Sequence, residues 1–297
     1  MRPRAVRVLI QVLMVAAGLA LAIYILGPLL WMVDASVQLD RDLFTVPPRI
    51  IPVQPTLDNY RYIITRKAPP SYLQATMGGR ASGEALSILP ALKNSFIVAG
   101  SVTVLNLLFS TLAAYTYARL RFRGRELTYA FILTSRLIPA MSVAIPVFVI
   151  VDRLHLMDTY GALILVYLAL TLPFTIWFLV KYFSFLPREI EEAALIDGCT
   201  WVGALRRVVA PVAAPGLAAA AAFAFMGAYS EFLYALFLTR SIASKTAPVV
   251  LVATAINDDV SFALASAALI LTVIPPVIFA LIFRSFITKG FVGALGR

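Results

Sequence analysis

Charged residues are scarce in this sequence. Asp, Glu, Lys and Arg make up 13% of the 297 residues, whereas an ordinary soluble domain has about 25%. Apolar residues reach 61%, compared with about 45–50% in such domains. A soluble protein of this length needs more charge to cover its surface, and a disordered chain has far fewer apolar residues. The composition therefore excludes a soluble enzyme, a disordered chain and a fibrous repeat, and it predicts an integral membrane protein.

Cysteine and histidine are almost absent, since the chain has only Cys199 and His155. These two residues cannot form a disulfide framework or supply the three or four ligands of a zinc site. We interpret His155 as a solvated residue in a short connection and Cys199 as a small packing residue. The sequence also lacks the GxxxxGK[ST] phosphate loop and the HExxH and GxSxG motifs. We therefore expect no metal site, no catalytic residues and no bound cofactor in this chain.

Long apolar runs dominate the sequence instead. A helix needs about 20 mostly apolar residues to cross about 30 Å of hydrocarbon. Six runs meet this length, at residues 8–33, 94–118, 127–151, 161–183, 208–236 and 262–287. The sequence thus predicts an all-α integral membrane protein with six transmembrane helices.

The first run follows three arginines, an arrangement that also occurs in secretory signal peptides. The apolar part of a signal peptide has only about 7–15 residues, however, and this run is much longer. We therefore interpret residues 1–33 as a cytoplasmic N-terminus followed by an uncleaved first transmembrane helix.

Basic residues in the short connections indicate the orientation of the helices, because cytoplasmic loops carry an excess of Lys and Arg. The connections on one side contain Arg2, Arg4, Arg7, Arg119, Arg121, Arg123, Arg125, Lys181, Arg188, Arg206, Arg207, Arg284, Lys289 and Arg297. This side is predicted to be cytoplasmic, and both termini lie on it. The net charge of +10 is then a signal of topology, and we do not expect a nucleic-acid partner.

The segment 34–91 is predicted to be extracytoplasmic. It is rich in proline, and small and polar residues surround Gly78-Gly79. We expect an extended stretch, one or two short interfacial helices and a flexible insertion at about 66–87. A core of five helices follows at 92–287, and a cytoplasmic tail at 288–297 ends the chain.

The cytoplasmic connection Pro187–Trp201 is predicted to form a short helix-turn-helix. Pro187 suits the first helical position, and the glutamates that follow it complement the positive end of a helix. Gly198 is expected to end this helix, and Thr200 is expected to cap the next one.

Two interpretations of this connection remain open on physical grounds. In the first, the small side chains of Ala193 and Ala194 allow a cleft in another protein to approach the helix closely. In the second, the connection is an ordinary amphipathic segment whose charges are merely solvated. Pro211 and Pro215 are expected to bend the second helix toward the membrane.

The residues from Glu192-Ala-Ala-Leu-Ile-Asp-Gly198 through Val208, Pro211 and Pro215 resemble the EAA loop of ATP-binding-cassette (ABC) importer permeases. Each spacing of that motif is kept. The sequence departs from it at Leu205, where an aromatic residue is common, and at Ala210, where Leu usually precedes the proline.

From about Asp58 onward, the chain is similar to the MalG-type, carbohydrate-importing branch of the binding-protein-dependent transport permeases. The supporting features are Leu57-Asp-Asn-Tyr60, Lys93-Asn-Ser95, the stretch from Tyr115 to Gly124, and Tyr229-Ser-Glu-Phe232. The tail at 287–297 resembles the Gly-rich tail of the family, which ends near the ATPase. The stretch 66–87 is longer than is usual in the family.

The resemblance implies a type I ABC importer permease: a non-catalytic subunit that moves a di- or oligosaccharide or a related polyol across a bacterial or archaeal cytoplasmic membrane. It implies ATPase docking through Glu191, Glu192, Ala193, Ala194, Asp197, Gly198 and Leu205, which lie within the segment 187–206, and through Pro211, which follows it. The implied partners are two ATPase subunits that hold ATP and Mg²⁺, a second permease subunit, and an extracytoplasmic sugar-binding protein or lipoprotein. In related complexes that binding protein is reached by the outer loop, here about 239–261.

Arg136 and Glu231 are the charges well inside the predicted spans. A charge at the centre of a membrane helix costs roughly 2.5–3.5 kcal/mol on insertion scales and usually faces the bundle interior or a water-filled cavity. The two residues either line the translocation path, or they pair with each other or reach the outer interface. Helix breaks are expected at Pro139, Pro146, Pro173, Pro275 and Pro276.

The candidate residues of the path are Arg136, Tyr229, Ser230, Glu231, Tyr115, Trp177 and Phe225. The aromatic residues could stack on sugar rings, although aromatics at such spacings also occur as core or lipid-facing residues. An ion-coupled secondary transporter that uses Arg136 and Glu231 is the alternative function, and the lack of an inverted repeat disfavours it. A membrane-embedded enzyme is disfavoured because the chain has no catalytic cluster.

Overall fold

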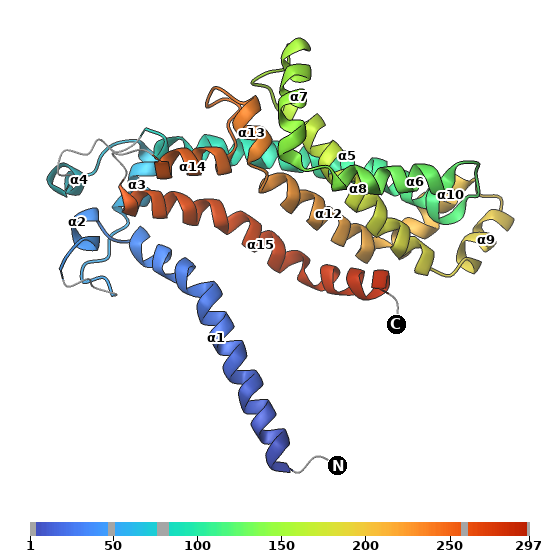
Figure 1. The fold of residues 1–297 in the computed structure, drawn as a ribbon, viewed down its shortest axis with the longest axis horizontal. Helices are drawn as coiled ribbons and strands as arrows, with labels where there is room; N and C mark the ends of the chain where they lie inside the picture. Colours follow the sequence, from blue (N-terminus) through green and yellow to red (C-terminus); the bar gives the residue numbers. More distant parts are fainter. Residues whose placement is uncertain (1–3, 47–50, 76–82, 257–260, 296–297) are drawn as a thin grey trace. The chain divides into compact units, whose positions relative to one another are not determined.

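The computed structural model describes residues 4–46, 51–75, 83–256 and 261–295, and all regular elements within these ranges are helices (Figure 1). This agrees with the predicted all-α class. The chain divides into two compact units. The first unit contains Met1–Leu89 and Leu251–Val273, and the second contains Pro90–Val250 and Ile274–Arg297.

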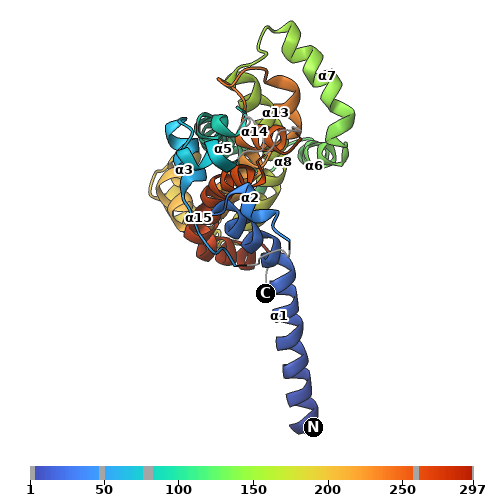
Figure 2. The same cartoon turned by 90° about the vertical axis from the view of Figure 1, so that its left-hand side faces the viewer.

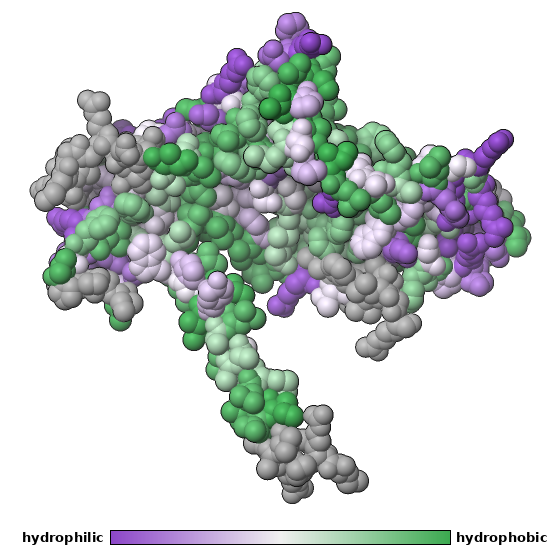
Figure 3. All heavy atoms as spheres, viewed as in Figure 1, coloured by the Kyte–Doolittle hydropathy of each residue, from purple (hydrophilic) through white to green (hydrophobic). Residues whose placement is uncertain are grey.

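The first unit begins with α1 (Arg4–Ser36), whose residues Leu9–Ser36 are long and apolar enough to span a membrane. The 18-residue window that defines this span is 0% buried inside the protein. Apolar side chains are exposed at most positions of α1 from Leu9 to Val33, and the face of the helix seen in Figure 3 is largely green. A helix that is apolar all round is suited to lipid or to contact with another helix.

Four short helices follow α1 within the described residues, where the sequence predicts one or two: α2 (Asp40–Leu43), α3 (Asp58–Thr65), α4 (Pro70–Ala75) and η1 (Ala85–Ser87). Asn59 holds several of them together. Its Nδ2 donates to the carbonyl oxygens of Ser36 at 2.8 Å and Gln38 at 2.7 Å, and its Oδ1 accepts from the Tyr72 hydroxyl at 2.5 Å. Residues 76–82 of the predicted insertion lie outside the described residues.

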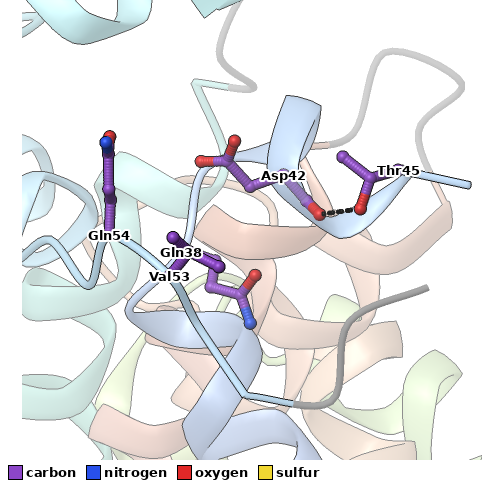
Figure 4. Close-up of a pocket in the computed structure, with 5 residues that line it drawn as sticks. All are labelled: Gln38, Asp42, Thr45, Val53 and Gln54. Atoms are coloured by element: carbon purple, nitrogen blue, oxygen red, sulfur yellow. Dashed lines mark hydrogen bonds between the residues drawn. The ribbon is translucent and has the colours of Figure 1, made fainter. Parts of the chain in front are cut away.

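A small polar cavity of about 170 Å³ lies in the same unit. The side chains of Gln38, Asp42, Thr45, Val53 and Gln54 line it, and they come from the end of α1, from α2 and from the chain before α3 (Figure 4). None of the functional residues proposed from the sequence lies among them.

The second unit contains most of the remaining helices. They are α5 (Ile88–Arg119), α6 (Arg125–Thr134), η2 (Ser135–Leu137), α7 (Ala140–Arg153), α8 (Tyr160–Phe185), α9 (Glu189–Ile196), α10 (Trp201–Ala204), the π-helix η3 (Leu205–Val209), α11 (Ala210–Val212), α12 (Ala214–Tyr229) and α13 (Leu233–Leu238). Helix α5 has its first two residues in the first unit, and two further helices, α14 (Ala247–Ile256) and α15 (Phe262–Leu295), also extend across the boundary between the units.

Four helices within the described residues are each long and apolar enough to span a membrane, and the number rises to six if each of two bent pairs counts as one span. The predicted third span is one bent pair, in which the axes of α6–η2 and α7 differ by 99°. Figure 2 shows α7 turned away from α6. The predicted fifth span bends by 84° between Val212 and Ala214.

Of the breaks predicted at Pro139, Pro146, Pro173, Pro275 and Pro276, only the one at Pro139 is present. Pro139 lies at the break before α7, where Ile138 and Pro139 have extended backbone with ψ of 122° and 129°. The residue before a proline disfavours the helical region, which explains this break. Pro146, Pro173 and the pair Pro275–Pro276 lie inside continuous helices. The prediction of breaks there was wrong, because membrane helices tolerate proline when nearby groups compensate for the lost hydrogen bond.

The predicted tail is also largely helical, since α15 continues to Leu295. The predicted outer loop at 239–261 contains α14, which the sequence analysis did not anticipate. Residues 257–260 of that loop lie outside the described residues.

Helices α8 and α12 pack closely in the core of the second unit. Gly216 of α12 lies against the ring of Tyr182 in α8, so that a Cβ atom at position 216 would come within 2.5 Å of Tyr182 Cδ1. Glycine is required at this position because any larger residue would collide with the ring.

We predict that Gly216→Ala destabilises the protein by about 1–3 kcal/mol, as overpacking of a core does. Gly227→Ala, also in α12, is the matched control, because its Cβ would meet Thr171 Cγ2 at an ordinary 3.5 Å. Thermal denaturation in detergent, with size-exclusion chromatography as the readout, measures the melting temperatures of the two variants. Equal melting temperatures for the two variants would contradict the prediction.

Candidate functional site

The connection between α8 and α12 forms the helix-turn-helix that the sequence predicts. Helix α9 ends in a Schellman motif: Gly198 has φ of +89°, its N–H donates to the carbonyl of Leu195 at 3.1 Å, and the N–H of Cys199 donates to Ala194 at 3.0 Å. The Thr200 hydroxyl accepts from the N–H of Gly203 at 3.2 Å and so caps α10. We call residues 187–206 the EAA segment.

The residues proposed for docking differ in exposure. Those on the surface are Glu192, Ala193, Asp197, Gly198 and Pro211. Those that are buried are Glu191, Ala194 and Leu205. The exposed set is accessible at the surface, whereas the buried set packs inside the protein.

Ile196 was not singled out from the sequence, yet it is 86% exposed. It follows Glu192 and Ala193 by four and three residues in α9, which is the spacing that places residues on one helix face. Trp201 and Val202, at the start of α10, are also largely exposed. Exposed apolar residues that lie together next to charged ones are typical of protein–protein contacts.

Glu191 anchors α9 to the end of α5. Its Oε2 lies 2.8 Å from Nε of Arg119, and neither side chain is more than 4% exposed. Its Oε1 accepts a hydrogen bond of 2.5 Å from the Tyr115 hydroxyl, and the Arg119 guanidinium also donates to the carbonyl of Leu186 at 3.1 Å. The buried charge is therefore paired and hydrogen-bonded, as a stable buried carboxylate requires.

The helix after α10 changes its winding before it turns toward α12. Residues Leu205–Val209 form a π-helix, a rare geometry that is frequent at functional sites. The 84° bend follows at Ala213, between Pro211 and Pro215. This agrees with the bend predicted from the two prolines.

A cavity of about 790 Å³ lies in the second unit, and residues of η2, α7, α8 and α13 contribute to its wall. Most of the lining is aliphatic. Arg136, Glu231 and Tyr234 are among its few polar side chains, and Pro139 and Pro173 lie in its wall. Ile138 and Pro139, at the break before α7, are therefore part of the wall of this cavity.

Arg136 and Glu231 line the same cavity but do not pair. The ion pairs among the described residues are Arg41–Asp42 and Arg119–Glu191. The guanidinium carbon of Arg136 lies 5.4 Å from the centre of the Phe174 ring, within the range of a cation–π contact.

Glu231 has a structural partner of its own. Its carboxylate accepts from the N–H groups of Tyr234 at 2.9 Å and Ala235 at 3.2 Å, and it thereby caps the start of α13. The two charges line one cavity and do not pair with each other. A role in the translocation path and a position at the outer interface both stay predictions.

The other proposed path residues lie elsewhere. Phe225 and Tyr229 are buried, and Phe225 stacks on Phe279 with ring centres 4.2 Å apart. Trp177 packs against Phe174, the Ser230 hydroxyl donates to a carbonyl within its own helix, and Tyr115 bonds to the EAA segment. None of these five is among the residues that line the cavity.

Comparison with known proteins identifies the family. Residues 86–292 match the family described as "Binding-protein-dependent transport system inner membrane component". The chain belongs to this family. The resemblance found in the sequence is therefore confirmed.

Several characterised proteins resemble this permease along most of its length. It is 32% identical over 284 residues to the trehalose/maltose transport system permease protein MalG of Thermococcus litoralis, with 95% of each chain covered. It is 36% identical over 265 residues to the sulfoquinovosyl glycerol transport system permease protein SmoH of Agrobacterium fabrum, covering 89% of this chain and 86% of that one. It is 34% identical over 271 residues to the trehalose transport system permease protein SugB of Mycobacterium tuberculosis, with 90% of each covered.

The fold also matches a solved structure, that of a bacterial ABC transporter involved in the import of the acidic polysaccharide alginate. The TM-score is 0.79 at 21% identity, and the match covers 96% of this chain and 98% of that chain. The type I permease fold predicted from the sequence is therefore confirmed.

Family membership decides between the functions considered from the sequence. The protein is a multi-pass membrane permease subunit, a non-catalytic component of an ABC importer. ATPase and binding-protein partners follow from this class of transporter. The ion-coupled secondary transporter and the membrane-embedded enzyme are both excluded by it.

We predict that Glu191→Ala destabilises the permease by about 3–5 kcal/mol, because it leaves the Arg119 guanidinium buried without its partner. Glu192→Ala removes the exposed neighbour and should change stability by less than about 0.5 kcal/mol. Thermal unfolding of the purified variants in detergent measures the difference. Similar losses in the two variants would show that the ion pair does not stabilise the fold.

Proposed function

We propose that this permease forms one half of the translocation pore of an ABC importer for a carbohydrate, either a di- or oligosaccharide or a related polyol. The exposed face of the EAA segment is the observation that carries the proposal, because it presents acidic, small and apolar residues on a helix held firmly by a buried ion pair. The names of the similar permeases, which concern trehalose, maltose and sulfoquinovosyl glycerol, support the substrate class.

The assembly we propose contains two ATPase subunits that bind ATP and Mg²⁺, a second permease subunit, and an extracytoplasmic sugar-binding protein. It lies in the cytoplasmic membrane of a bacterium or archaeon. The basic residues in the short connections support an orientation with both termini and the EAA segment in the cytoplasm. ATP is bound in the partner ATPases, and the permease receives their motion mechanically.

In this proposal, α9 is the element that enters a cleft of the ATPase. Glu192 and Asp197 provide charge at its edges, Ala193 allows a close approach, and Ile196 contributes the apolar contact. Since Ile196 is 86% exposed, burying it against a partner removes apolar surface from water and favours association. The buried ion pair of Glu191 holds α9 in place when force is applied.

We predict that Ile196→Glu lowers co-purification of the ATPase with the permease at least tenfold, because it places a charge at the centre of the contact. Leu57→Glu is the matched control, since Leu57 is 68% exposed and belongs to the predicted extracytoplasmic segment. Affinity purification through a tag on the permease, followed by quantification of the ATPase, measures the effect. Unchanged recovery of the ATPase with Ile196→Glu would argue against docking through α9.

We further propose that the 790 Å³ cavity belongs to the translocation path. Its volume is within the range of about 300–1,000 Å³ that small-molecule sites occupy. Arg136 and Glu231 supply polar groups that a sugar can bind by hydrogen bonds, while the aliphatic wall allows it to pass.

We predict that Val143→Trp lowers carbohydrate uptake at least tenfold, because the indole would fill the cavity that Val143 lines. Ile145→Trp adds the same bulk to α7 at a position that is 71% exposed and does not line the cavity. Uptake of labelled sugar in cells checks this, with ATPase co-purification to confirm assembly. Normal uptake with Val143→Trp would show that the cavity is not part of the translocation path.

A further inference from the structure

The connection between α13 and α14, which we call the outer loop 239–246, is held by Asp158. The Oδ1 of Asp158 accepts from the N–H of Arg240 at 2.7 Å, from the N–H of Ser241 at 3.0 Å and from the hydroxyl of Ser244. Its own N–H donates to the carbonyl of Leu238 at 2.8 Å. Burial raises the pKa of Asp158, but the bonds from Ser241, Ser244 and Arg240 outweigh it and hold this pKa well below its ordinary value.

The start of α5 holds the same loop from another side. The Nδ2 of Asn94 donates to the carbonyls of Ile242 at 3.0 Å and Lys245 at 2.9 Å, and its Oδ1 accepts from the Tyr160 hydroxyl at 2.6 Å. The N–H of Ala247 donates to the Ser95 hydroxyl at 2.8 Å. These contacts give a structural role to the Lys93-Asn-Ser95 motif noted in the sequence.

The bonds leave the side chains at the tip of the loop exposed. Arg240, Ser241, Ile242 and Ala243 are on the surface, whereas Ser244 is buried. A loop whose backbone is fixed in this way moves together with the elements that hold it. The loop is therefore a preorganised surface at the same end of the bundle as Asn94.

The opposite end of α5 carries the ion pair with the EAA segment. Tyr115 and Arg119 lie in its last turns, and both contact Glu191. The 25 residue steps between Asn94 and Arg119 correspond to about 37 Å of helix. Helix α5 is continuous over this distance, in contrast to the bent pairs α6–α7 and α10–α12.

We propose that α5 is a rigid coupling element that transmits displacement of the EAA segment to the outer loop 239–246. Glu191 and Arg119 are positioning residues at one end, and Asn94 and Asp158 are positioning residues at the other. Coupling through a contiguous chain of hydrogen bonds and one unbroken helix requires no contact between the two sites. The inference rests on the proposed function, because an ATPase must displace the EAA segment.

The test follows the exposure of the loop in the assembled importer. In a Cys199→Ser background, which removes the only native cysteine, Ile242→Cys places a reactive thiol on the loop. Its rate of labelling by a water-soluble maleimide is measured for the tagged importer complex without nucleotide and after trapping with ATP and vanadate. We expect trapping to change this rate at least threefold.

The coupling is then interrupted at each end in turn. Asn94→Ala and Glu191→Gln should each reduce the change in labelling rate at Ile242→Cys to less than 1.5-fold, although the ATPase still co-purifies. Thr103→Ala is the control within α5, because the Thr103 hydroxyl bonds only to a carbonyl of its own helix and should leave the threefold change intact. If Asn94→Ala fails to assemble, Tyr160→Phe removes only the hydroxyl bonded to Asn94 and takes its place.

The coupling role of α5 would be overturned if trapping changed the labelling rate threefold in both interrupted variants. It would also be overturned if trapping did not change the labelling rate when α5 and its contacts are intact. Failure of the proposed function gives a different result. If α9 does not dock, an Ile196→Cys thiol reacts with the maleimide equally fast with and without the ATPase. If α9 docks, the ATPase slows this reaction. Protection at Ile196 together with an unaltered response at Ile242 in the interrupted variants refutes only the coupling.

Discussion

The buried ion pair between Glu191 and Arg119 is the contact on which the functional arrangement depends. Two charges that are each almost fully removed from solvent must be paired, or one of them becomes very costly. That requirement ties α9 to the end of α5, and the Tyr115 hydroxyl strengthens the link. A short helix of eight residues would otherwise be marginally stable at a surface. The anchor therefore stabilises α9 in its position.

The permease combines stiff and broken helices, and the two kinds have different roles. The continuous helices α5 and α8 provide the frame of the second unit. The break at Pro139 lies in the wall of the large cavity. The bend at Ala213 keeps its backbone hydrogen bonds, since the N–H of Ala213 donates to the carbonyl of Val209 and its own carbonyl accepts from the N–H of Leu217. Irregular backbone at membrane depth is tolerated only where protein or a water-filled space covers it. The position of Pro139 in the wall of the cavity agrees with this rule.

Much of this architecture was predictable from local sequence. Apolar runs predicted the spanning segments, and Gly198 and Thr200 predicted the ends of α9 and α10, because a positive φ and a capping hydroxyl are local requirements. The positions of prolines predicted the helix breaks less reliably. Pro139 breaks its span, yet Pro146 and Pro173 do not, since the outcome depends on which neighbouring groups replace the missing hydrogen bond.

The sequence by itself determined the membrane location, the helical class and the position of the EAA segment, because composition, period and motif spacing are properties of the chain alone. Only the tertiary structure decided that Glu191 is an internal anchor while Glu192 faces outward, and that Asn94 and Asp158 hold one loop. Adjacent glutamates look alike in a sequence. Their environments differ because Tyr115, 76 positions away in the chain, and Arg119 contact Glu191 from the end of α5.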